Sequence, residues 1–567
     1  MEIINVAHQL NVFLKVLCVF GVFSLSTAQE LQLKIISKDS IETDIINSIG
    51  YPKTFDNFDD LQTEVSLFKD QLYIRGYIEA QLLEISQTPP LLVAKLSLGP
   101  KYEFIQLYAN KSVFELLEMD GVKDLESTPY YKAEIITLEP LLNSLTEFLT
   151  AKSYPFASIS LKRISPIGKS TLRADLVVET KQARQLQSVE IKGYEKFPRS
   201  FIKHYLGIKT NTPFDLKAIQ SKTEAINQLL FAKQIRPAEV LFTQDTTRVY
   251  LNLEKTKSNR FDGFLGFGSD ETSGGLELNG YLNLNLINNL NFGESFRLNY
   301  RSDENDLKTF EAQLTLPYLF KTPIGSELEL NIVKKDSTFT TAEQAASVYY
   351  QINPKQKVFL GIRSTQSNAL LPETTSNVSD YKTNAYELKY TYQQRTPQNL
   401  LVPVSSAIEF RLSKSKRKIM NEKTNQLHYL LKTSKVFNLN PKNSFYIQLQ
   451  VQGIDSDTYL FNELIRFGGI NSIRGFEENS INASRLGVLA SEYRYQLSPS
   501  LYVHTIIDAG YFETPIVSDQ KLYGFGFGFG LLTDAGLLKF NLANGQVENQ
   551  TFKFSDSKIH LSLRATF

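Results

Sequence analysis

The chain has 567 residues, which is too long for one ordinary domain, so the sequence predicts several domains. Its 61 Lys and Arg residues almost balance its 60 Asp and Glu residues. The formal net charge of +1 gives no strong overall basic charge that would point to nucleic acid, so no nucleic-acid partner is expected.

The first 28 residues are typical of a secretory signal peptide. An apolar run from Val12 to Leu25 precedes the small residues Ser26-Thr27-Ala28, where a signal peptidase would cleave. A membrane anchor is the alternative, but the run is shorter than the roughly 20 apolar residues of a spanning helix. The only cysteine, Cys18, lies in this segment, so the mature chain is expected to form no disulfide.

The region from Leu31 to Thr256 mixes helical and strand patterns and repeats itself. The motif at Tyr77–Leu82 matches Tyr154–Ile159, and Ile235–Val240 is a weaker third copy. Their alanines are about 80 residues apart, which indicates a repeated small domain. An amphipathic helix is predicted before each copy, in the segments 61–74, 138–151 and 216–232.

The third copy reads as strand, short helix, long helix, strand and strand, with the first strand at 188–193 and the short helix at 199–206. This order resembles a POTRA domain. We therefore expect three POTRA-like domains at 31–102, 103–181 and 182–256, although generic α+β linker domains would fit the pattern too. An exposed sheet edge in such a domain could accept an extended client strand by main-chain hydrogen bonds.

From residue 260 to 567 the helical pattern is replaced by alternation of apolar and polar residues. Ile447, Leu449 and Val451 alternate with glutamines, and Phe525 and Phe527 with glycines. About 16 strands can be counted, joined in turn by short turns and longer polar links, which is typical of an outer-membrane β-barrel. A soluble sandwich would share the alternation but not the pattern of link lengths.

The two ends of the barrel region carry further signals. The last segment has apolar residues at alternate positions back from Phe567, which resembles the C-terminal signal of bacterial outer-membrane barrels. The first strand contains Gly263, Gly266 and Gly268, which predict weak packing where the first and last strands must meet. Ordinary flexibility at a domain junction would also explain these glycines.

The polar motif that stands out is Arg474-Gly475-Phe476, in a loop behind Gly468-Gly469. In the two segments that follow, Glu492 and Asp508 each share a face with other polar residues, so both are expected to point into the barrel lumen. Arg474 could fold inward and pair with them through its planar fork. The motif resembles the signature of the BamA/TamA outer-membrane assembly superfamily.

The resemblance implies an outer-membrane assembly or translocation factor, not an enzyme, that uses no cofactor. Three POTRA-like domains before 16 strands are closest to a TamA layout. The resemblance also implies POTRA domains in the periplasm of a Gram-negative cell and a seam between first and last strands. The expected partners are unfolded outer-membrane or secreted proteins, membrane lipid and a TamB-like protein. The loop of Arg474 would support barrel assembly, or would merely stiffen the barrel.

Other functions are weighed against this one. A two-partner secretion exporter of a single client is the main alternative, but such proteins usually have two POTRA domains and Tyr where this chain has Phe476. A passive outer-membrane pore would not need three repeats. The five histidines are scattered and predict no metal site, and Gly168-Lys169-Ser170 lacks the upstream glycine of a phosphate-binding loop.

Overall fold

The computed structural model describes residues 31–88, 90–125, 128–269, 276–302, 307–370, 378–396, 399–516, 519–533, 536–550 and 553–565. The signal peptide expected over residues 1–28 and the terminal Phe567 lie outside these residues. The chain forms two compact units, one of residues 1–184 with 213–215, the other of residues 185–212 with 216–567.

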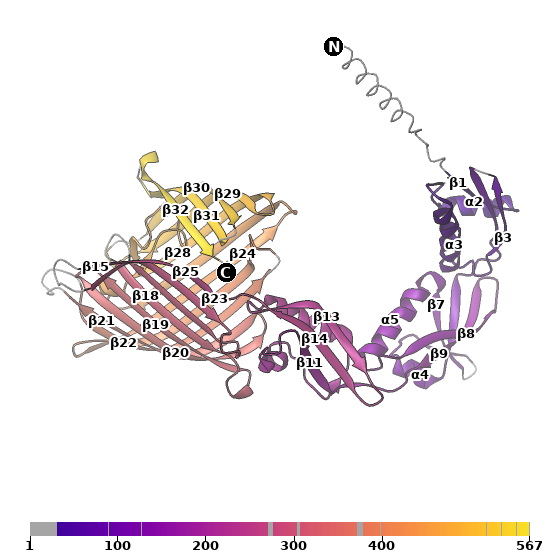
Figure 1. The fold of residues 1–567 in the computed structure, drawn as a ribbon, viewed down its shortest axis with the longest axis horizontal. Coiled ribbons are helices and arrows are strands. Elements are labelled where there is room, and N and C mark those ends of the chain that lie inside the picture. The colour runs from indigo at the N-terminus through magenta and orange to yellow at the C-terminus, as the bar shows by residue number, and fades with distance from the viewer. Residues whose placement is uncertain are drawn as a thin grey trace, which may run out of the picture. The chain divides into compact units, whose positions relative to one another are not determined.

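The first unit contains two α/β modules (Figure 1). The elements of the first module are β1 (Leu31–Ser37), α2 (Ser40–Ile49), β2 (Thr54–Phe55), α3 (Phe58–Ile74), β3 (Gln81–Thr88) and β4 (Leu91–Ser97). Those of the second are β5 (Phe104–Tyr108), α4 (Lys111–Leu116), β6 (Lys123–Leu125), β7 (Thr128–Glu134), η1 (Ile135–Thr137), α5 (Leu138–Ala151), β8 (Ser158–Pro166) and β9 (Thr171–Glu179). Their sheets have the orders β2-β1-β4-β3 and β6-β7-β5-β9-β8.

Each module is held by one helix face packed on its sheet. In α3 the buried residues Leu61, Val65, Phe68 and Leu72 recur at helical spacing and therefore lie on one face. The side chain of Asn57 caps the start of this helix by accepting a hydrogen bond from the Asp60 N–H at 2.8 Å. This amphipathic pattern is why the sequence predicts α3 and α5 within a few residues.

A third module begins the second unit. Its elements are β10 (Gln185–Leu186), β11 (Ser188–Lys192), the π-helical turn η2 (Phe201–Tyr205), β12 (Thr212–Pro213), α6 (Leu216–Thr223), η3 (Glu224–Gln228), β13 (Ala232–Phe242) and β14 (Thr247–Lys255). The single helix expected over 216–232 is wrong, because α6 ends at Thr223, the 3-10 turn η3 ends at Gln228 and strand β13 begins at Ala232. There the cross-strand pairing of Ala232 with Lys255 outweighs local helix propensity.

All three modules share one strand arrangement. The last strand is flanked by the first long strand in parallel and by the preceding strand in antiparallel orientation: β1-β4-β3, β5-β9-β8 and β11-β14-β13. The strands β3, β8 and β13 therefore each lie at a sheet edge. The motif that repeats in the sequence therefore corresponds to a strand arrangement that repeats in the structure.

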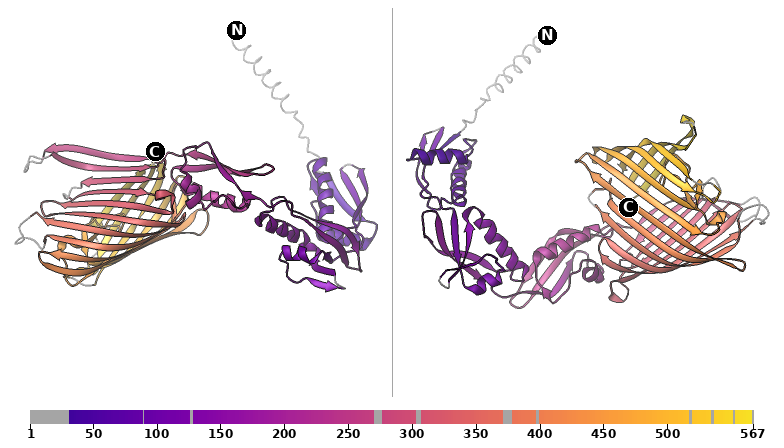
Figure 2. Two further views of the ribbon diagram at one scale, coloured as in Figure 1. Left: turned by 90° about the horizontal axis from the view of Figure 1, so that it is seen from below. Right: turned by 180° about the vertical axis from the view of Figure 1, so that it is seen from behind.

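The rest of the second unit is one antiparallel sheet of 16 strands, which confirms the predicted fold class. Its strands are β15 (Arg260–Ser269), β16 (Leu276–Ile287), β17 (Ser295–Ser302), β18 (Leu307–Leu316), β19 (Ile324–Lys335), β20 (Phe339–Asn353), β21 (Gln356–Ala369), β22 (Tyr381–Arg395), β23 (Val404–Ile419), β24 (Glu422–Asn438), β25 (Asn443–Ser456), β28 (Arg485–Ser498), β29 (Leu501–Glu513), β30 (Gln520–Thr533), β31 (Gly536–Val547) and β32 (Ser557–Ala565). The sheet curves round into a barrel (Figure 2).

The two faces of this sheet differ in chemistry. Large apolar side chains project outward and are exposed, for example Leu360 at 66 %, Ile507 at 64 %, Phe527 at 60 % and Leu561 at 65 %. Polar, charged and glycine residues alternate with them on the inner face. An apolar outer face around a polar interior is the pattern of a barrel in lipid.

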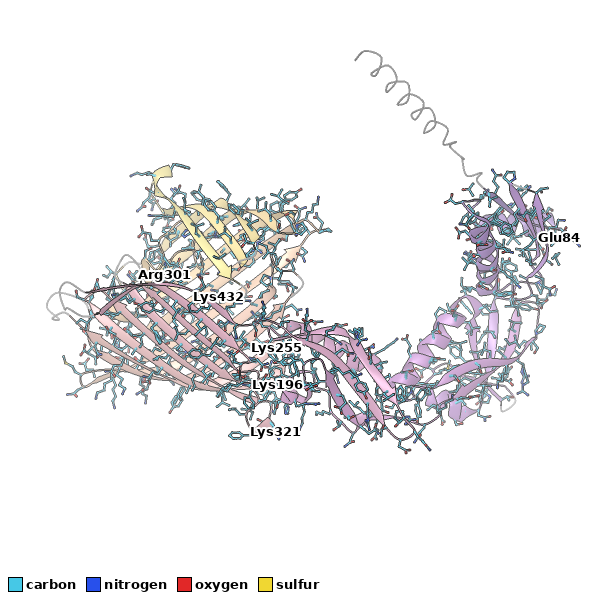
Figure 3. The ribbon with its side chains drawn as sticks, viewed as in Figure 1. Glu84, Lys196, Lys255, Arg301, Lys321 and Lys432 are labelled. Atoms are coloured by element: carbon cyan, nitrogen blue, oxygen red, sulfur yellow. The ribbon has the colours of Figure 1, made fainter. Side chains whose placement is uncertain are left out.

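The third module contacts the turn between β18 and β19, which contains η4 (Leu319–Lys321). The ring of Phe201 packs edge-on against Tyr318 with centroids 4.8 Å apart. The Nε2 atom of His204 lies 2.8 Å from the carbonyl oxygen of Lys321, which Figure 3 labels. The π-helical turn η2 therefore packs against this turn of the barrel.

The link between β22 and β23 is longer than the other turns at its end of the barrel, and its contacts explain why. Leu401 in this link is buried against Tyr502 and Leu537, which belong to β29 and β31. The link thus extends from β22 and β23 to β29 and β31, which are not their neighbours in the sheet. A turn of a few residues could not reach that far.

Candidate functional site

The loop that carries the Arg474 motif joins β25 to β28, the eleventh and twelfth strands of the barrel. We call residues 457–484 the lumen loop and residues 468–480 its tip. The base contains η6 (Phe461–Glu463) and a ribbon of β26 (Ile465–Phe467) paired with β27 (Ile481–Ala483). At the start of the tip, Gly468 and Gly469 adopt φ of 115° and 91°, which favour glycine.

Arg474 is buried and bound to Asp508. Its Nε donates to Asp508 Oδ2 at 2.8 Å, its Nη2 donates to Oδ1 at 2.5 Å, and its backbone N–H donates to Oδ2 at 3.0 Å. The side chain of Arg474 is 4 % exposed and that of Asp508 is 0 % exposed. A bidentate pair of this kind holds both position and orientation of the guanidinium.

Glu492 is the second carboxylate of the site. It accepts from Arg474 Nη1 at 2.5 Å through Oε1 and from Arg494 Nε at 2.7 Å through Oε2. The Arg494 guanidinium also lies over the ring of Tyr446, 4.4 Å from its centroid. Two arginines and two carboxylates thus form one charge-compensated network on β28, β29 and the loop tip.

The wall opposite the tip is built from glycines and one histidine. A Cβ atom at Gly475 would overlap the backbone of Asn544 and Gly545 on β31, and one at Gly524 on β30 would overlap the carbonyl oxygen of Arg474. The N–H of Gly475 donates to His560 Nε2 on β32 at 3.1 Å. The tip therefore lies close to β30 and β31 because these strands carry glycine at the positions that face it.

Phe476 and Glu478 complete the tip. Phe476 packs on a buried cluster that includes Ile473, Leu486 and Leu522. Burial raises the pKa of Glu478, an effect partly offset by the hydrogen bond of 3.1 Å that its carboxylate accepts from the Ile470 N–H.

The base of the lumen loop is anchored separately by Arg417 on β23, which is 1 % exposed. Its guanidinium forms an ion pair with Glu463 and donates to the carbonyl and hydroxyl oxygens of Thr458, at 3.1 Å and 2.5 Å. Next to it, Asn462 Nδ2 donates to Ser367 Oγ at 2.8 Å. The loop is thus fixed at its base to β21 and β23 and at its tip to β28–β32.

Replacing Arg417 by lysine is expected to loosen the loop base, because the ammonium keeps the charge but loses the fork that binds Thr458 and Glu463 together. We expect a loss of about 1–2 kcal/mol of unfolding free energy and faster proteolysis within residues 457–466. Limited proteolysis followed by mass spectrometry measures the second effect. The exposed neighbour Lys418, changed to alanine, is the control and should leave the digestion pattern unchanged.

The structure brings Arg474, Glu492 and Asp508 together, as parity along the strands suggests. The glycines of the expected seam lie in β15, where Gly263 pairs with Leu282. Gly266 and Gly268 pair with Asn279 and Glu277.

Sequence reasoning missed Arg417, His560 and the inner glycines of β30 and β31. The alternate glycines from Gly524 to Gly530 were a usable signal, since a bare inner face implies that something lies against it. Nothing in the sequence pairs Arg417 with Glu463, because the two are 46 residues apart on different elements.

Over the described residues no helix is long and apolar enough to cross a membrane. In the same part of the chain no three His, Cys, Asp or Glu side chains are grouped to hold a metal ion.

Comparison with known proteins gives structural matches only. No protein-family model matches the sequence, and no curated protein matches it either. CdiB from Acinetobacter baumannii is 14 % identical with a TM-score of 0.50, over 82 % of this chain and 90 % of that chain. CdiB from Escherichia coli is 13 % identical with a TM-score of 0.50, over 88 % and 96 %. BamA from Haemophilus ducreyi lacking POTRA domains 1-3 is 12 % identical with a TM-score of 0.49, over 82 % and 98 %.

The protein therefore has the fold of the CdiB structures, a 16-stranded barrel preceded by an α/β region.

Proposed function

We propose that this protein is an outer-membrane assembly or translocation factor of a Gram-negative cell. Its three α/β modules would be POTRA-like domains in the periplasm, with bounds near 31–102, 103–181 and 182–256. They would receive unfolded client proteins, and the barrel would insert them into the membrane or export them. The proposal needs no nucleotide or other cofactor.

The observation that carries the proposal is the state of the two barrel edges. Within the described residues, ladders join every neighbouring pair from β15 to β32, but no ladder joins β32 to β15. An unpaired edge in lipid is costly, because its N–H and C=O groups have no partner. A client strand could satisfy those groups, and its own folding in the bilayer would provide the driving force.

The edges of the modules support the first step of this route. In β3 the exposed residues include Leu83 at 47 %, in β8 Ile164 at 51 %, and in β13 Ile235 at 56 %. A strand at a sheet edge is able to pair with an extended segment of another chain, with little demand on its sequence. Three such edges in tandem suit a client before it reaches the barrel.

Depletion of the protein followed by quantitative proteomics of the outer membrane tests the proposal. We expect several β-barrel proteins to fall together, because their insertion would require this factor. Loss of a single secreted product with a normal membrane proteome would instead identify an exporter. A normal proteome and secretome with altered solute uptake would identify a pore and contradict the proposal.

A further inference from the structure

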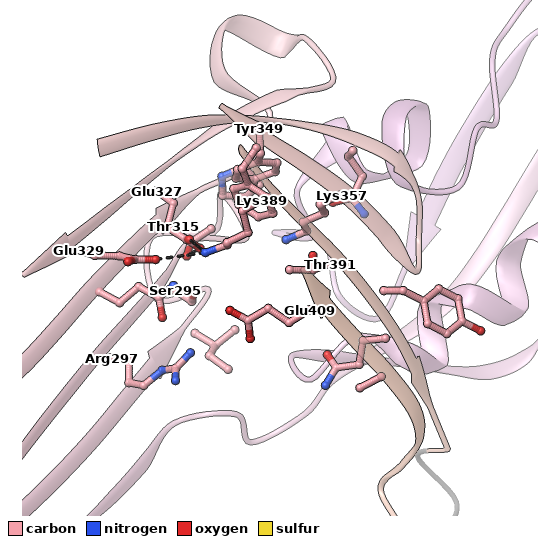
Figure 4. Close-up of a pocket in the computed structure, with 18 of the residues that line it drawn as sticks. Ser295, Arg297, Thr315, Glu327, Glu329, Tyr349, Lys357, Lys389, Thr391 and Glu409 are labelled. Carbon is pink, nitrogen blue, oxygen red and sulfur yellow. Dashed lines mark hydrogen bonds and ion pairs between the residues drawn. The ribbon is translucent and has the colours of Figure 1, made fainter. Parts of the chain in front are cut away.

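A cavity of about 900 Å³ lies inside the second unit, between the third module and the barrel wall. Tyr205, Leu229 and Phe231 of the module line it together with residues from strands β17 to β24. Figure 4 shows Arg297, Lys357 and Glu409 reaching into this space from different strands. Of the described residues, eight lysines and arginines and only five glutamates line the cavity, so its lining carries an excess of positive charge.

Two of the cations that line the cavity are compensated by several carboxylates. Arg363 binds Glu329 at 3.1 Å and Glu387 at 2.9 Å, and it also pairs with Glu343. Lys389 binds Glu327 at 2.6 Å and Glu329 at 3.1 Å. This network uses Glu327, Glu329, Glu343 and Glu387, so these four carboxylates are already paired.

Three other cations of the lining are not compensated. Within the described part of the chain, Lys355, Lys357 and Arg395 form no ion pair, although each is only partly exposed. Lys357 lies over the ring of Tyr349, 4.7 Å from its centroid, and Arg395 Nε donates to the Gln393 side chain at 3.2 Å. We call Lys355, Lys357 and Arg395 the cationic mouth.

The cationic mouth lies where the chain turns back toward the third module. Lys355 is in the turn between β20 and β21, Lys357 opens β21, and Arg395 ends β22. Lys355, Lys357 and Arg395 line the same cavity as Tyr205 of the module. Like charges held together away from bulk water favour an anion between them.

We propose that the cationic mouth binds an acidic, extended segment of a client polypeptide as it passes from the third module into the barrel. This inference rests on the proposed function and adds the charge of the client segment to it. Alternate side chains of an extended segment point to the same side, so carboxylates at every second position could meet the lysines and the arginine. Phe231, Tyr318 and Phe359 also line the cavity. They would contact the apolar residues that alternate with the carboxylates in the client segment.

The test is a binding measurement on the full-length protein in detergent micelles. Three fluorescent peptides of about twelve residues, enough for an extended span of roughly 40 Å, share one apolar set and carry Glu, Gln or Lys at alternate positions. Fluorescence anisotropy is measured for each. We expect the Glu peptide to bind at least about tenfold more tightly than the Lys peptide, with the preference weakening at high salt.

The double variant Lys357→Gln with Arg395→Gln should remove most of this preference. The matched control is Lys416→Gln with Lys418→Gln, which deletes the same charge from exposed positions on β23 and should leave the preference intact. Equal binding of the three peptides would overturn the inference. A preference for the Glu peptide that persists in the Lys357→Gln, Arg395→Gln variant would also overturn it, as would a preference that is lost in the Lys416→Gln, Lys418→Gln control. The inference would likewise fail if inorganic phosphate, at the same concentration as the peptide, abolished the preference.

This result is separable from the depletion experiment. Loss of barrel proteins on depletion without any peptide preference would overturn the acidic-segment inference alone. A cavity-dependent preference combined with an unchanged proteome and secretome would overturn the proposed function alone.

Discussion

Replacing Arg474 by alanine is expected to destabilise the barrel by about 3–5 kcal/mol. The change leaves Asp508, whose side chain is 0 % exposed, without its guanidinium partner, and leaves Glu492 with Arg494 alone. A buried carboxylate without a counter-charge is costly, and this cost exceeds the value of the lost contacts themselves. Urea unfolding of the folded protein in micelles measures the change.

Arg485 provides a matched control for this substitution. It also pairs with an acidic residue, Asp455, at 2.7 Å, but the two side chains are 44 % and 61 % exposed. Its replacement by alanine should therefore cost less than about 1 kcal/mol. Arg474→Lys should fall between the two, because lysine keeps the charge but cannot bind Asp508 with two parallel hydrogen bonds. Equal effects at Arg474 and Arg485 would contradict the structural account of the site.

Replacing Gly475 by alanine is expected to displace the loop tip from the barrel wall. Gly475 has a φ of 91°, and an added Cβ atom would overlap the backbone of Asn544 and Gly545, which cannot move aside without breaking β31. Arg474, which is 3 % exposed, should then become accessible to trypsin. Mass spectrometry would detect cleavage after Arg474 in the variant and protection in the parent protein.

Gly487 on β28 is the control, since a Cβ atom there would meet nothing within 4 Å. The Gly487→Ala variant should keep Arg474 protected. Continued protection in Gly475→Ala as well would mean that the tip does not depend on the bare wall of β30 and β31.

The architecture could be predicted because it depends on local patterns. Alternation along the strands separates the outer from the inner face, and counting alternating segments leads to the 16 strands that the structure contains. The same parity puts Glu492 and Asp508 on one side of neighbouring strands. The helix expected over 216–232 ends at Thr223 in the structure, and no local pattern reports the long-range pairing of β13 with β14 that begins at Ala232.

Much of the site could not be predicted for the same reason. His560 reaches Gly475 only because β32 completes the sheet beside β31, which depends on the order and register of distant strands. Arg417 is one of several cations in the segment from Lys414 to Lys418, and only its inward direction distinguishes it. The cationic mouth likewise emerges only when β20, β21 and β22 are placed side by side.

The way in which the lumen loop is fastened has a mechanical consequence. Arg474 and Gly475 bind the tip to β28, β29 and β32, whereas Arg417 binds the base to β23. If the first and last strands of the barrel separate, we therefore expect the C-terminal strands and the loop tip to move together as one rigid body. Gly468 and Gly469 lie between the anchored base and the anchored tip, and they would be the hinge for this movement.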